Sequence, residues 1–345
     1  MRQLLWGTLL CCAVCHSSNR CLASRIIDET EPNNSKGGAT PAPLLLTGDA
    51  IRGHATAGDV DYWRIATAPA QLGIYRHTLT LESPFNPGGT LGGTAGVNSS
   101  LRGVSQSRGV ITETEEVSVQ DSATASARFG GTTLITQWYG FGKSEQLFYA
   151  INNTADGDPT YQATLQTATV TPIDAGTYQR GAITLSSVAA GHGNDTEMWV
   201  YNGNFELLGG NDNATPGHTD PEPSRITHDF NTPGIYYVAI SEYDLAVRGI
   251  HDVNDGGFDR LQRTPDFDNI ILEGGPHGAT PLLNVSMVIT DSTGMPHTVT
   301  MLREHQLDVI FARLTVVPEP AAAVVAALIL VALRRRRPVL PGSGL

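Results

Sequence analysis

Between residues 24 and 317 the chain has no cysteine, because all four cysteines of the 345-residue sequence lie among its first 21 residues. Disulfide bonds and thiolate metal sites are therefore excluded there, and stability must come from core packing, with calcium as a further contributor. Basic residues are also scarce: this region has 33 acidic and 16 basic residues, and its only lysines are Lys36 and Lys143. That balance argues against a nucleic-acid partner, since phosphate binding depends on Lys and Arg. It fits either a solvated acidic surface or divalent-cation binding.

The first 23 residues have the pattern of a secretory signal peptide. Arg2 supplies a positive charge, residues 4–14 form an apolar stretch too short to span a membrane, and Ala23 ends a small-residue cleavage context before Ser24. Such a segment is removed on export. We therefore expect the chain from residue 24 onward to be exported and to fold outside the cytoplasm.

The C-terminal region predicts a single hydrophobic helix between a proline-rich break and a basic cluster. The apolar run is residues 321–333, and a tail of residues 338–345 follows the cluster. The flanking residues are Val317, Pro318, Glu319 and Pro320 before the run and Arg334, Arg335, Arg336 and Arg337 after it. Thirteen helical residues cover only about 20 Å of a hydrocarbon core about 30 Å thick, so a transient membrane contact is favoured over a permanent span. The arginines would hold their end of the helix on the cytoplasmic side.

This tail resembles the PEP-CTERM sorting signal of Gram-negative and related bacteria. In that family a Pro-Glu-Pro tripeptide precedes a membrane helix and an arginine-rich end, as residues 318–320 and 334–337 do here. The helix is shorter than in most members, and the trailing octapeptide is unusual for them. The resemblance implies that an exosortase-type sorting enzyme acts on residues 317–337, and that the chain is anchored at, or released from, a bacterial cell envelope.

The body of the chain is predicted to be all-β. Short alternating segments rich in β-branched and aromatic residues are bounded by Gly, Pro, Asn and Asp, which is typical of a β-sandwich. These segments are residues 75–81, 146–151, 161–165, 197–201 and 235–240. We expect one elaborated sandwich or two consecutive jelly-roll-like sandwiches, over residues 24–171 and 172–316. A Gly-, Ser- and Thr-rich stretch, residues 84–142, predicts an insertion in the first, as a long connection or as weak edge strands.

Two acidic segments suggest a metal site near the start of this body. Their candidate ligands are Glu29, Glu31, Asn33 and Asn34 in the first segment and Asp59 and Asp61 in the second. Alternate residues of an extended segment point to the same side, so each segment can present a pair of oxygen-bearing side chains. Calcium takes six to eight oxygens, which two converging pairs can supply. An acidic linker followed by a turn into a strand explains the same residues equally well.

The spacing of these residues also resembles the opening of the bacterial pre-peptidase C-terminal domain. The matching motifs are Glu-x-Glu-Pro-Asn-Asn at residues 29–34 and Gly-Asp-x-Asp-Tyr at residues 58–62. The motifs are also similar to those of the collagen-binding domains of clostridial collagenases. The resemblance implies a β-sandwich over residues 24–171 and calcium bound by the six candidate ligands. It does not imply collagen binding, because the tyrosine-rich strand used for it has no clear counterpart here.

A weaker candidate site lies in the second half of the chain. Its residues are Asp195, Asp212 and Asn213, within a stretch that resembles the later half of the same sandwich type. Turn chemistry alone explains Asn and Asp at such points, so a structural role is the favoured account. Residues 252–257 hint at an EF-hand loop, but position twelve of that loop is Arg263, where a bidentate Glu is required.

The sequence has no catalytic motif, since it lacks a zincin helix, a nucleophile elbow and a P-loop. We therefore expect a non-enzymatic exported surface or matrix protein with a calcium-stabilised sandwich that binds polysaccharide or other envelope components. The alternative is a secreted hydrolase, or an accessory protein of one. The expected partners are the membrane, a sorting enzyme and extracellular polysaccharide.

Overall fold

The all-β prediction is confirmed for the part of the chain that the structure, a computed structural model, describes. The described residues are 24–56, 58–82, 97–102, 106–107, 110–111, 134–153, 160–191, 196–211, 214, 223–242, 245–246, 270–273, 284–303 and 308–318. They form strands and two short 3-10 helices, η1 (Lys36–Gly38) and η2 (Val188–Ala190), with no α-helix among them. None of these described helices has the length and apolar character needed to cross a membrane. The hydrophobic helix expected over residues 321–333 lies outside the described residues.

The first two sheets are built mainly from residues before Val170. The larger has seven strands, which in spatial order are β1 (Ile26–Asp28), β3 (Ala50–His54), β11 (Thr160–Val170), β5 (Ile74–Glu82), β9 (Leu134–Gly140), β19 (Ile270–Glu273) and β18 (Leu245–Ala246). The smaller has four: β2 (Thr40–Leu45), β4 (Val60–Thr67), β10 (Gln146–Asn153) and β6 (Val97–Arg102). The pairs β1–β3 and β2–β4 are parallel, and the other pairs in these sheets are antiparallel. A separate short pair joins β7 (Gln106–Ser107) and β8 (Val110–Ile111).

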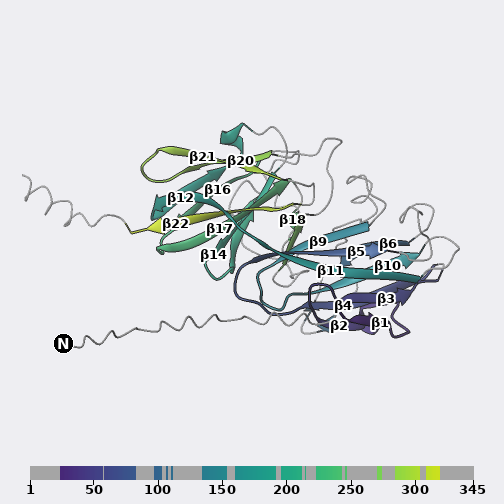
Figure 1. Ribbon diagram of the computed structural model, residues 1–345. Coiled ribbons are helices and arrows are strands. Elements are labelled where there is room, and N and C mark those ends of the chain that lie inside the picture. The colour runs from purple at the N-terminus through teal and green to yellow at the C-terminus, as the bar shows by residue number, and fades with distance from the viewer. Residues whose placement is uncertain are drawn as a thin grey trace, which may run out of the picture.

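Two further sheets are built from residues after Pro172. One has the spatial order β12 (Ile173–Gln179), β22 (Ile310–Val317), β17 (Gly234–Glu242), β14 (Thr196–Asn202) and β15 (Leu207–Asn211). The other has the order β16 (Arg225–Phe230), β13 (Gly181–Ser186), β20 (Asn284–Thr290) and β21 (Pro296–Leu302). Figure 1 shows the two pairs of sheets as two groups of strands, with β11 leading from the first group to β12 in the second.

Alternation of side chains explains why these segments form half-buried strands. In β4 the buried positions are Asp61, Trp63, Ile65 and Thr67, and the residues between them are more exposed. The strand β20 likewise alternates, with Val285, Met287 and Ile289 buried. Successive side chains of a strand point to opposite faces, so one face of each strand enters a core.

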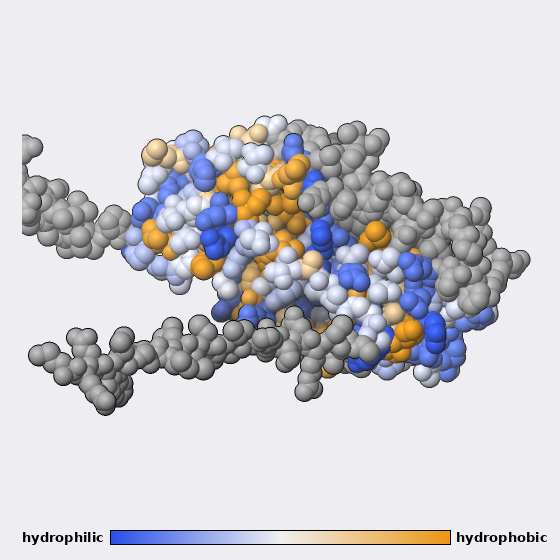
Figure 2. Space-filling view, in the orientation of Figure 1, coloured by the Kyte–Doolittle hydropathy of each residue, from blue (hydrophilic) through white to orange (hydrophobic). Residues whose placement is uncertain are grey.

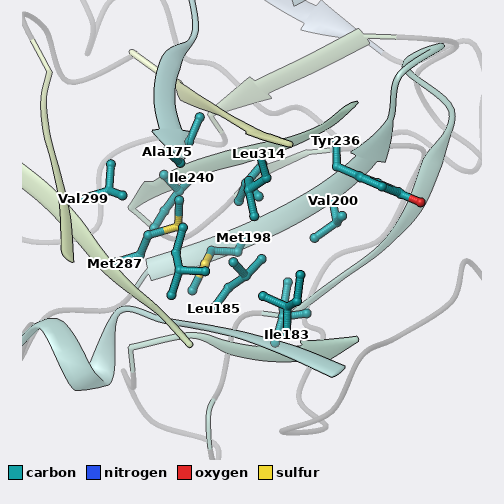
Figure 3. Packing of buried hydrophobic residues seen from close by; sticks show 14 of the residues in the cluster. Ala175, Ile183, Leu185, Met198, Val200, Tyr236, Ile240, Met287, Val299 and Leu314 are labelled. Atoms are coloured by element: carbon teal, nitrogen blue, oxygen red, sulfur yellow. The ribbon is translucent and has the colours of Figure 1, made fainter. Parts of the chain in front are cut away.

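Each pair of sheets encloses its own core. In the first, Trp63, Trp138 and Tyr161 are completely buried among aliphatic side chains. In the second, Ile183 and Leu185 of β13 point toward Met198 and Val200 of β14, as Figure 3 shows. Both groups are therefore β-sandwiches, in which the facing sheets bury apolar side chains between them.

The two sandwiches also share a third buried cluster. Strand β14 is buried on both faces, so Trp199 and Tyr201 are covered on the side away from the second core. From the first sandwich Phe141 packs against them, with its ring centroid 5.1 Å from that of Tyr201 and 4.7 Å from that of Phe205. Aromatic pairs in this range add to the stability that burial supplies. In Figure 2 apolar residues gather over the second sandwich toward its junction with the first.

Two strands, β9 and β19, pair at positions that the sequence does not predict. Strand β9 lies within the expected insertion, residues 84–142, yet it pairs with β5 along seven residues and supplies Trp138 to the core. This part of the range is thus integral to the sandwich. Strand β19 comes from the expected second region but extends the large sheet of the first sandwich beyond β9. The two units are therefore interleaved in sequence.

Replacing Phe141 with alanine should lower the free energy of unfolding by about 3–5 kcal/mol, because it removes a buried ring from between the sandwiches. Urea denaturation followed by tryptophan fluorescence measures this change. The matched control is Leu72→Ala, since Leu72 is 55% exposed and its truncation should change stability by no more than about 0.5 kcal/mol. Equal effects of the two substitutions would contradict the importance of the shared cluster.

Candidate metal centre

Three carboxylates meet at one end of the first sandwich. Oxygen atoms of Glu29, Glu31 and Asp61 all lie within 4.8 Å of one another. Glu29 and Glu31 follow β1, at the edge of the larger sheet, and Asp61 lies near the start of β4 in the smaller sheet. The cluster thus joins segments from both layers of the sandwich (Figure 1).

Asp61 is the buried member of this cluster. It is completely buried, and in the described part of the chain neither of its carboxylate oxygens has a hydrogen-bond donor. It faces inward because β4 directs Trp63 and Ile65 into the core, and residue 61 lies on the same side of the strand. A buried carboxylate without a partner is costly. This cost must be relieved by a proton or by a cation.

The charge distribution around Asp61 disfavours its ionised form. Burial, followed by the negative charges of Glu29, Asp59 and Glu31, raises the pKa of Asp61 to about 7. The nearby hydroxyl of Tyr161 opposes this rise, but it donates its hydrogen to Oε2 of Glu29, 3.1 Å away. Among the described residues no Lys or Arg forms an ion pair with the cluster. The cluster therefore has an excess of negative charge.

Glu29 is held in a defined position. Its Oε1 accepts a hydrogen bond from the backbone N–H of His54 at 2.6 Å, and its Oε2 accepts one from Tyr161. The Tyr161 hydroxyl in turn accepts from Nε1 of Trp63 at 2.8 Å. Gly53 leaves the space for this arrangement, since a Cβ atom there would lie 2.1 Å from Oε2 of Glu29 and 2.2 Å from the Tyr161 hydroxyl. Glu29 is thus held in place by hydrogen bonds within the protein.

Asn33 follows Glu31 on the same segment and carries a neutral side-chain oxygen. Its side chain is completely buried, and its Oδ1 has no hydrogen-bond partner in the described part of the chain. Its backbone N–H donates to Oε2 of Glu31 at 2.9 Å, and its carbonyl accepts from the N–H of Tyr62 at 2.9 Å. Asn33 therefore ties the Glu31 segment to β4 while keeping one buried acceptor oxygen open.

The remaining two candidates of this group pair with each other. The side-chain amide of Asn34 donates to Oδ1 of Asp59, which also accepts from the N–H of Val60 at 2.9 Å. Asn34 is exposed, and Asp59 lies outside the group of three carboxylates. Of the six candidates, the structure brings Glu29, Glu31 and Asp61 together, with Asn33 hydrogen-bonded to Glu31. It sets the pair of Asn34 and Asp59 apart from them.

These residues fit a hard divalent cation. Calcium prefers six to eight oxygen ligands at flexible angles, and the three carboxylates with the open Oδ1 of Asn33 offer oxygens only. The cluster has no His or Cys, the ligands typical of structural zinc sites. The two orphaned buried groups, Asp61 and Asn33, are the polar atoms that such an ion would satisfy.

Three residues of this centre are not recognisable as site residues from the sequence. Tyr161 lies almost a hundred residues beyond Trp63 along the chain, and their contact depends on the facing of the two sheets. His54 contributes a backbone N–H, which any residue carries. Gly53 is the one available signal, because a glycine inside a strand often marks a close approach of another group.

The other expected sites lie outside the described residues. This applies to Asp195, Asp212 and Asn213 of the weaker metal candidate, and to Glu319, Pro320, Arg334, Arg335, Arg336 and Arg337 of the sorting signal. Of the sorting signal, Val317 ends β22, and Pro318 follows it as an exposed residue.

In the presence of a chelator, the free energy of unfolding should fall as pH rises from about 4 to about 7. The folded chain holds a proton on Asp61 up to about pH 7, whereas an unfolded aspartate loses it near pH 3.9. The folded state thus binds more protons in this window, and deprotonation costs stability. Urea denaturation at a series of pH values measures the slope, and Asp61→Asn should reduce it.

Asp28→Asn is the matched control for this slope. Asp28 carries an exposed carboxylate that accepts a hydrogen bond from Nε of Arg52 at 2.7 Å. Its replacement should leave the decrease in the free energy of unfolding between about pH 4 and pH 7 unchanged. A slope that persists unchanged in Asp61→Asn would show that another group titrates in this window.

Comparisons with known proteins add no assignment to this geometry. No protein family matches the chain, and no curated protein matches it. The chemistry of the site must therefore be inferred from its own residues.

Proposed function

We propose that the chain is an exported, non-enzymatic surface or matrix protein whose first sandwich binds a calcium ion. The supporting observation is Asp61, a buried carboxylate that has no hydrogen-bond partner among the described residues and lies beside two further carboxylates. Glu29, Glu31, Asp61 and the side-chain oxygen of Asn33 would hold the ion, with water completing its coordination.

Such an ion would act as a clamp between the layers of the sandwich. Glu29 and Glu31 belong to the segment that leaves β1, whereas Asp61 belongs to β4 in the facing sheet. A cation bound by all three residues would fix the N-terminal segment to the sandwich and neutralise the charge excess. In a region without cysteine, this clamp would take the place of a disulfide.

We further propose that the exported protein binds polysaccharide or other envelope components. The proposal is supported by the acidic, cysteine-free composition and by the sequence pattern of the two ends of the chain. An exosortase-type enzyme acting near Pro318 would deliver the protein to the envelope, with the apolar run of residues 321–333 as a transient membrane contact.

Calcium should raise the thermal midpoint of unfolding of the fragment of residues 24–317. An ion that binds only the folded state at a concentration one hundred times its Kd stabilises by about 2.7 kcal/mol. Thermal melting and calorimetric titration with calcium chloride in chelator-treated buffer measure the effect. Glu31→Gln and Asp61→Asn should abolish it.

The behaviour of Asp61→Asn without calcium separates lost binding from misfolding. Because the substitution removes an uncompensated buried charge, this variant should be at least as stable as the unmodified chain at pH 7 in chelator. Asp28→Asn alters an exposed carboxylate next to Glu29 in the sequence. This variant should retain the full increase in thermal midpoint on addition of calcium. The calcium proposal fails if the unmodified chain shows no shift, or if Asp61→Asn shows an undiminished one.

Replacement of Pro318, Glu319 and Pro320 with alanine tests the proposed sorting separately. In a bacterial host that has an exosortase, the unmodified full chain should appear processed at the envelope or in the medium. The triple variant should accumulate unprocessed in the membrane fraction. Fractionation and immunoblotting distinguish these outcomes, and identical distributions would contradict the sorting role.

A further inference from the structure

A second concave site lies at the other end of β4. Asp61 stands near the start of this strand and Thr67 at its end, so the two sites are separated by about 20 Å along the strand. Thr67 borders a cavity of about 190 Å³, which is also lined by Leu45, Pro69, Tyr75 and other residues of the first sandwich. Most of the described lining is apolar, and its one charged group is the carboxylate of Glu145.

Glu145 is fixed at this cavity by three hydrogen bonds. Its Oε1 accepts from the backbone N–H groups of Phe141 at 2.5 Å and Lys143 at 2.8 Å. Its Oε2 accepts from the hydroxyl of Thr67 at 2.9 Å. Gly140 provides the room, since a Cβ atom there would lie 2.8 Å from Cδ of Glu145. The side chain is therefore buried and oriented, with lone pairs left for a further donor.

No cation of the described chain compensates this carboxylate. The donors to Glu145 are all neutral, and Nζ of the neighbouring Lys143 instead donates to the carbonyl of Phe205 at 2.9 Å. His77 lines the same cavity, but burial lowers its pKa to about 4, so it is uncharged at neutral pH. A buried carboxylate that lacks a counter-ion among the described residues is suited to a cation from outside the chain.

We propose that this cavity binds an alkylammonium group, with the ammonium at Glu145 and the alkyl chain against Leu45 and Pro69. Tyr75 lines the same cavity, and an aromatic ring is a suitable neighbour for a cation. The volume suits a short alkyl chain with one ammonium group. An anionic ligand is disfavoured by Glu145 and by the net charge of the chain, −12.

The alkylammonium group has two sources, a free amine or the lysine side chain of a peptide. Both present a primary ammonium on a flexible aliphatic stem. A peptide would in addition bring a backbone to the rim of the cavity, beside the exposed side chain of Leu46. Titrations with butylammonium and with Nα-acetyl-lysine methylamide therefore distinguish the two sources. Tighter binding of the lysine derivative indicates a peptide, and tighter binding of butylammonium indicates a free amine.

The test is an NMR titration of the isotope-labelled fragment of residues 24–317 with butylammonium chloride. The backbone amides of Phe141 and Lys143 donate to Glu145, so their signals should shift and saturate. Glu145→Gln keeps an oxygen acceptor for these amides but removes the charge, and it should weaken binding at least about tenfold. Butan-1-ol, the neutral analogue, should bind the unmodified chain at least about tenfold more weakly.

Two further variants complete the design. Glu82→Gln removes the same charge from the exposed far end of β5 and should leave the affinity unchanged. Ala68→Phe fills the cavity without altering Glu145 and should abolish the shifts. The proposal is overturned if butylammonium causes no saturable shift at tens of millimolar, or if Glu145→Gln or butan-1-ol binds as well. Repeating the titration with and without calcium keeps its outcome independent of the metal centre.

Discussion

The inward-facing carboxylate of Asp61 is the constraint on which the proposed chemistry of the first sandwich depends. Strand β4 must direct Trp63 and Ile65 into the core, and the same alternation buries residue 61. An aspartate at that position cannot remain charged without compensation, yet its neighbours Glu29 and Glu31 add negative charge. A proton or a metal ion must therefore complete the fold at this end, which ties the stability of the sandwich to its solution conditions.

Two other buried aspartates, Asp49 and Asp308, differ from Asp61 in having hydrogen-bond partners. Asp49 is buried beside Arg25, which donates to it from its guanidinium and its backbone, and Asp49 also accepts from the N–H of Leu46. Asp308 accepts hydrogen bonds from Arg76 and from polar side chains of β9, at the junction of the sandwiches. Both carboxylates are satisfied by their own chain. Asp61 has no such partner among the described residues, and the contrast supports a ligand role over a purely structural one.

Local pattern was a good guide to the strands and a partial guide to the candidate site. The alternating segments at residues 75–81 and 146–151 lie within β5 and β10, because a half-buried strand imposes a period of two on its own residues. The motif around Glu29 and Glu31 identified two of the three clustered carboxylates. The motif at residues 58–62 identified the third, Asp61. The pairing of Asn34 with Asp59 was not predictable, since it depends on how a turn closes against β4.

The sequence by itself determined the class of the protein: β-rich, acidic and free of cysteine after residue 21. These features follow from composition and short-range periodicity, which each segment carries on its own. Only the tertiary structure decided which acidic residues become buried, that β9 belongs to the core of the first sandwich, and that Glu145 lines a cavity. Burial of a charge depends on strands distant in sequence, and no local pattern records which of them will pack over it.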